Sequence, residues 1–175
     1  MSKEQKKDLL KFLKPFPDEV REIALWLRAF VWDLYPSANE LIYDNYNALA
    51  IGWSPTDRVG HIFCNIAVGR TSYNVHFGFY WGVQIADPKK MLIGEGNQYR
   101  YILVKKKEDF PKGYIKKLLK EAYANSLAKV KPAPGKVERK INQLSGETIT
   151  KSISPVKREK GKPKKKAAKT KRGNT

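Results

Sequence analysis

The spacing of apolar residues predicts two long helices at the two ends of a folded domain. In residues 18–35 the apolar side chains recur at intervals of three and four, as on one face of an α-helix. Pro17 directly precedes this segment and Pro36 directly follows it, and both positions suit a helix boundary. Residues 110–129 show the same pattern, with lysines on the opposite face. A shorter amphipathic segment over 3–14 indicates a further helix.

Between these helices the pattern changes to short runs of aromatic and β-branched residues, separated by Gly, Pro, Asn and Asp. Such runs are typical of strands joined by tight turns. No spacer of helix length forces a parallel crossover, so the sheet is expected to be antiparallel. Residues 86–94 carry the capping signals of one brief helix. The expected strands lie at about 40–44, 47–53, 60–69, 72–80 and 98–104.

Together these elements predict a two-layer α+β domain over residues 1–130, with about five antiparallel strands and helices at both ends. The remaining residues, 131–175, lack apolar periodicity and are rich in Pro, Gly and Lys. This composition predicts a disordered, basic C-terminal tail.

Most of the positive charge belongs to this tail. The whole chain has 35 Lys and Arg against 17 Asp and Glu, a net charge of +18. Residues 129–175 contain 16 basic and 3 acidic residues and so account for +13 of it. Between positions 157 and 172 ten basic residues accompany one acid, Glu159. The ten are Lys157, Arg158, Lys160, Lys162, Lys164, Lys165, Lys166, Lys169, Lys171 and Arg172.

A lysine-rich segment of this kind resembles the tails of linker histones and of histone-like bacterial proteins. It is expected to bind the phosphates of nucleic acid without sequence preference, because each neutralised phosphate releases counterions. No aromatic residue lies within 157–172, so base stacking by the tail itself is not expected. A tail that only improves solubility is the alternative.

Residues typical of catalysis are few. Cys64 lies within an apolar strand pattern, which predicts a buried structural thiol. His61 and His76 do not form a metal-binding spacing with it, and no motif for nucleophilic or acid–base catalysis is present. No enzymatic activity, metal or cofactor is therefore expected.

The same features indicate a cytoplasmic protein, with association with the nucleoid as the more specific expectation from the tail. A single cysteine excludes an internal disulfide framework. The N-terminal residues lack the pattern of a signal peptide, and no apolar run reaches the length of a membrane span.

One segment of the domain, residues 42–49, combines tyrosines with Asn and Asp in a turn. These residues either form the turn and pack at a sheet edge, or belong to a recognition patch with polar and aromatic residues from later strands. The candidate ligand patch comprises Tyr43, Asp44, Asn45, Tyr46, Asn47, His76, Tyr80, Trp81 and Arg100.

Several stretches resemble the YdhG-like proteins, a bacterial domain family of unknown function. They are Tyr43 to Ala50, Ser54 to Arg58, and the segment with Asp87, Pro88, Leu92, Gly94, Gly96 and Arg100. The resemblance covers about residues 17–125. It implies a two-layer α+β fold of the YjbR or secretion-chaperone type, which is sometimes compared with frataxin.

Some YdhG-like proteins are described as frataxin-like iron chaperones that use an acidic surface on the first helix and the neighbouring strand. The acidic residues in this region are Asp18, Glu19, Glu22, Asp33, Glu40 and Asp44. The first three alternate with Arg21 and suit the start of a helix, where negative charge meets the helix dipole. Three functions therefore stand as hypotheses: a domain tethered to nucleic acid by its tail, an intracellular iron chaperone, and a protein-interaction module.

Overall fold

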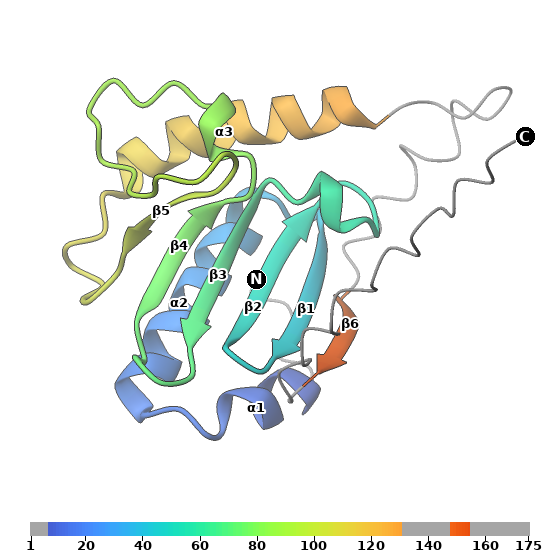
Figure 1. The fold of residues 1–175 in the computed structure, drawn as a ribbon, viewed down its shortest axis with the longest axis vertical. Coiled ribbons are helices and arrows are strands. Elements are labelled where there is room, and N and C mark those ends of the chain that lie inside the picture. Colours follow the sequence, from blue (N-terminus) through green and yellow to red (C-terminus); the bar gives the residue numbers. More distant parts are fainter. Residues whose placement is uncertain (1–6, 131–147, 155–175) are drawn as a thin grey trace, which may run out of the picture.

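The computed structural model describes residues 7–130 and 148–154 (Figure 1). Its helices are α1 (Lys7–Leu13), α2 (Asp18–Leu34) and α3 (Lys112–Lys129), with two short 3-10 helices, η1 (Val59–His61) and η2 (Gly82–Gln84). The strands are β1 (Asn39–Asn45), β2 (Ala48–Ser54), β3 (Cys64–Gly69), β4 (Val75–Phe79), β5 (Arg100–Leu103) and β6 (Thr148–Ser154). The predicted α+β fold, with its terminal helices and five antiparallel strands, is confirmed.

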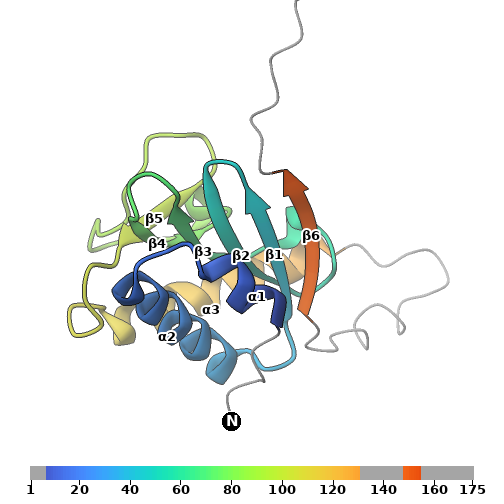
Figure 2. The same cartoon turned by 90° about the horizontal axis from the view of Figure 1, so that it is seen from below.

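The two long helices cover the same face of the sheet (Figure 2). Each begins directly after a proline, Pro17 before α2 and Pro111 before α3, whose fixed φ angle suits the first helical turn. Asp18 and Glu19 place negative charge at the positive end of the α2 dipole. Among residues 7–130 and 148–154, no helix has both the length and the hydropathy that a membrane span requires.

The strands follow the order β5-β4-β3-β2-β1-β6 across the sheet. Each of the first five pairs antiparallel with its neighbour in the chain. β6 pairs in parallel with β1 at the edge of the sheet (Figures 1 and 2). The presence of β6 corrects the prediction that all of residues 131–175 form a disordered tail. The physical reason is that residues 148–150 and 153 are β-branched and favour a strand. The other residues of the predicted tail lie outside the described residues.

Alternate residues of the strands point toward the helices and form the core. Ile42, Ile51, Ile66 and Phe77 are successive cross-strand neighbours, and all four are fully buried. Phe30 of α2 meets this row edge-on, with its ring centroid 6.4 Å from that of Phe77. Complete burial of each such side chain contributes about 1.5–3 kcal/mol to folding, so this row fixes α2 on the sheet.

A buried ion pair also joins α2 to β1. Arg28 Nε lies 2.5 Å from Glu40 Oε1, and Arg28 Nη2 lies 3.0 Å from Glu40 Oε2, so the contact is bidentate. The two side chains are 4% and 0% exposed. Because a charge at this depth is costly without its partner, the pair holds β1 in one position against α2.

Two local predictions are wrong. Residues 86–94 form a turn rather than a brief helix, because the Asp87 carboxylate accepts a hydrogen bond from Leu92 N–H at 2.8 Å and so closes a loop. The strand predicted over 60–69 begins only at Cys64, because η1 occupies its first residues.

Candidate nucleic-acid interface

The basic segment, defined as residues 157–172, follows β6 at one corner of the sheet. Its ten basic residues lie outside the described residues, but the strand that precedes them is described. Asn45 at the end of β1 pairs with Ser154 at the end of β6. Lys157, the first residue of the basic segment, is three residues further along the chain.

Arg70, which follows β3, holds the β1–β2 turn at this corner. Its Nε donates to Asn45 O at 2.7 Å, and its Nη2 pairs with the Asp44 carboxylate. Its backbone N–H donates to Asn47 O at 3.0 Å. Asp44, Asn45 and Asn47 of the candidate patch therefore build the turn, whereas Tyr46 beside them has a side chain that is 45% exposed.

Tyr43 and His76 lie on the face of the sheet that points away from α2 and α3, here called the open face. They belong to one cross-strand row, which also contains Ala50, Ala67 and Leu103. The two alanines, called the alanine row below, are partly exposed. Three strand spacings separate Tyr43 from His76, about 14 Å, so the two side chains share a face without forming one compact site.

The hydroxyl group of Tyr43 is shielded from solvent. It has no hydrogen-bond partner among the described residues. Burial raises the pKa of Tyr43, with further contributions from Tyr80 and from the Asp57 carboxylate, so the phenol is protonated at neutral pH. Tyr80 of the candidate patch therefore affects Tyr43 only through the ionised form of the phenol.

Three rings are stacked in series around β4 and β5. His76 and Tyr101 are nearly parallel, with an interplanar angle of 3° and centroids 4.1 Å apart. Tyr101 also stacks on Tyr99 at 5.7 Å and 20°. Burial lowers the pKa of His76, so its imidazole is neutral at pH 7. The candidate patch omits both tyrosines, although their spacing of two residues places them on one face of a strand.

Trp81 and Arg100 of the candidate patch serve other parts of the fold. Trp81 Nε1 donates to Gly60 O at 2.8 Å, and the Lys129 ammonium lies 3.6 Å from the centroid of the indole ring. Arg100 Nη1 donates to Gly96 O at 2.6 Å and so fixes the loop before β5. The structure thus divides the candidate patch among the corner, the open face and these two loops.

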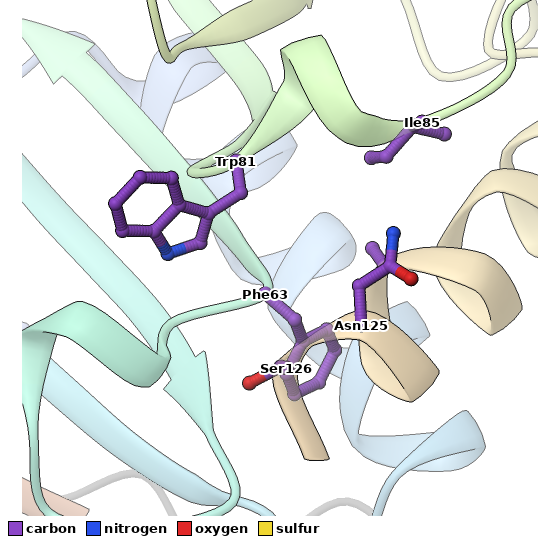
Figure 3. Close-up of a pocket in the computed structure, with 6 residues that line it drawn as sticks. Phe63, Trp81, Ile85, Asn125 and Ser126 are labelled. Carbon is purple, nitrogen blue, oxygen red and sulfur yellow. The ribbon is translucent and has the colours of Figure 1, made fainter. Parts of the chain in front are cut away.

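A small hollow beside Trp81 is lined by side chains of α3 and of the loops that face it (Figure 3). It leaves no room for a water molecule. Asn125 of α3 donates to Gln84 O at 3.1 Å, and the Ser126 hydroxyl donates to His61 O. The hollow is therefore a packing seam between α3 and the loops rather than a ligand site. Its lining residues are Phe63, Trp81, Ile85, Ala122, Asn125 and Ser126.

Acidic residues do not converge on a metal centre in the part of the chain that the structure describes. Within residues 7–130 and 148–154, no group of three or more His, Cys, Asp or Glu side chains is placed to hold a metal ion. Cys64 is fully buried, and burial raises the pKa of its thiol well above the ordinary value. Four carboxylates named by the iron-chaperone hypothesis pair with cations: Asp18 with Arg21, Glu22 with Lys107, Glu40 with Arg28, and Asp44 with Arg70.

Comparison of the chain with protein-family models, with curated proteins and with solved structures gave no match. The resemblance to the YdhG-like proteins therefore stays a prediction.

Proposed function

We propose that the protein binds nucleic acid non-specifically through the basic segment and that the α+β domain anchors this segment. The observation that carries the proposal is the ratio of ten Lys and Arg residues to one Glu within residues 157–172. Duplex DNA carries one negative charge per about 1.7 Å of its axis, so several closely spaced lysines and arginines can each neutralise a phosphate at any position along it. The released counterions drive binding, which makes it independent of base sequence.

The pairing of β6 with β1 supports an anchoring role for the domain. The ladder runs from Glu40 and Thr148 to Asn45 and Ser154, and the Arg28–Glu40 ion pair fixes the first of these β1 residues against α2. The basic segment thus continues from an ordered edge strand. Nucleic acid bound by the segment is expected to stay close to this edge of the sheet.

The test compares the full-length protein with a chain shortened to residues 1–154, using fluorescence anisotropy of a short labelled duplex in dilute salt. The shortened chain keeps β6, so a loss of binding does not arise from a missing strand. We expect it to lose most of the affinity for the duplex. Unchanged affinity would place the nucleic-acid site in the folded domain and contradict the proposal.

Two matched triple variants distinguish the effect of charges in the basic segment from the effect of the protein's net charge. Replacing Lys164, Lys165 and Lys166 with Ala removes three charges from the segment. Replacing Lys116, Lys117 and Lys120, which are exposed on α3, removes three charges from the domain. The first variant is expected to bind duplex about tenfold or more weakly, and the second about as well as the parent. Equal losses would show that overall charge alone attracts the DNA.

A further inference from the structure

Loops cover only part of the open face. Ile62 packs over Gly52, where an added Cβ would lie 2.9 Å from Ile62 Cδ1. In the same way the Tyr99 hydroxyl occupies the place that a Cβ at Gly78 would take. The alanine row next to these glycines is partly exposed, and α2 and α3 lie on the other side of the sheet (Figure 2). Among the described residues, nothing covers the alanine row completely, so this part of the open face is accessible to a ligand.

The stacked rings end beside the alanine row. Tyr101 contacts a ring on each side of the series, Tyr99 and His76. His76 is the last member, and among the described residues Tyr101 is its one aromatic ring partner. Its cross-strand neighbours are Ala67, with only a methyl group, and Leu103, whose side chain is 40% exposed. Because the His76 side chain is only partly buried, a planar group that stacks on its ring would extend the series.

We propose that the stacked series Tyr99–Tyr101–His76 is a platform for the bases of single-stranded nucleic acid. This inference rests on the proposed function, because the basic segment holds the phosphates. Every base has a π-face, so stacking on a ring adds affinity without sequence preference. Bases within a duplex are already paired and stacked, so only unpaired bases can use the platform.

The position of the basic segment favours a nucleic acid over a small planar ligand. His76 lies in the same cross-strand row as Tyr43, and Asn45, two residues after Tyr43, pairs with the last residue of β6. The platform and the start of the basic segment therefore belong to the same end of the sheet. Lys105 and Lys106 lie just beyond β5, after Val104, and are exposed, so they provide cations for phosphates at this end of the sheet.

The test uses the full-length protein with a His76→Ala substitution. Fluorescence anisotropy compares a labelled oligothymidine, an abasic strand of the same length and a duplex. Loss of one stacking ring is expected to weaken oligothymidine binding about tenfold and to leave abasic and duplex binding unchanged. His76→Phe retains a planar ring and is expected to restore the affinity. Leu127→Ala, which shortens an exposed side chain on α3 at the other side of the sheet, is the control and is expected to have no effect.

The outcomes separate this inference from the proposed function. If the Lys164, Lys165 and Lys166 triple variant weakens all three ligands while His76→Ala changes none, the platform is wrong and the proposed function stands. If His76→Ala weakens only oligothymidine binding and the triple variant has no effect, the platform stands and the tail proposal fails. Equal losses of oligothymidine and abasic binding in His76→Ala would also overturn the platform, since base stacking cannot cause them.

Discussion

Glu40→Ala is expected to destabilise the domain strongly, because it leaves the Arg28 guanidinium buried without its carboxylate. The two Glu40 oxygens lie 2.5 and 3.0 Å from guanidinium nitrogens, and both side chains are buried. Removing one partner of such a pair costs about 3–5 kcal/mol. The free energy of unfolding of a domain is only about 5–15 kcal/mol, so this cost is a large share of the total stability. Losing the ion pair is also expected to loosen β1, the strand that pairs with β6.

The assay is urea unfolding followed by tryptophan fluorescence, because Trp32 and Trp53 are buried in contact with each other. Glu22→Ala is the control: Glu22 pairs with Lys107 at 3.2 Å on the surface, and such pairs contribute at most about 1 kcal/mol.

A double variant, Arg28→Met with Glu40→Leu, removes both charges and is expected to recover most of the stability that Glu40→Ala loses. A loss below about 1 kcal/mol for Glu40→Ala would refute the reasoning. So would a double variant as unstable as the single one, because the cost would then not come from a buried charge that has lost its carboxylate.

Three further predictions concern the fold. Gly78→Ala, whose Cβ would overlap the Tyr99 hydroxyl, is expected to lower the free energy of unfolding in urea by about 1–3 kcal/mol. An added Cβ at Gly113 in α3 meets nothing within 4 Å, so Gly113→Ala should raise the free energy of unfolding by up to about 1 kcal/mol. A stabilising Gly78→Ala together with a destabilising Gly113→Ala would contradict these contacts. Removing all residues after β6 should leave the calorimetric midpoint within about 1 °C of that of the full-length protein. Removing all residues after α3 should lower the midpoint by about 4 °C or more, because β1 then loses its pairing with β6. Equal midpoints would argue against β6. The raised pKa of the buried Cys64 thiol predicts that a thiol reagent at pH 8 labels the folded protein far more slowly than the urea-unfolded protein, and rapid labelling of the folded protein would oppose this.

Elements with a clear local period follow from the sequence. The apolar stripes of α2 and α3 predict both helices and the face that each buries. The alternation of β1 to β4 likewise predicts an antiparallel sheet. β6 does not follow, because it is seven residues within a basic region and its partner β1 is roughly one hundred residues away in the chain. Only the pairing itself identifies it.

The grouping of residues in the candidate patch likewise could not be predicted from the sequence alone. Tyr43 and Asp44 are adjacent in sequence, yet the alternation of a strand sends them to opposite faces, where one joins the open face and the other pairs with Arg70. The stack of His76 on Tyr101 depends on the register of β4 against β5. β5 is only four residues long, too short for its pattern to reveal which side chains it places together.

The most direct test of the proposed function is the salt dependence of duplex binding by the full-length protein. If six of the ten basic residues engage phosphates, the slope of log affinity against log salt concentration is about −5, and it is the same on two unrelated duplexes. Replacing Lys164, Lys165 and Lys166 with Ala is expected to flatten the slope by up to about 3 units without creating a sequence preference. Binding that is insensitive to salt, or a slope that the triple variant leaves unchanged, would contradict the role of the basic segment.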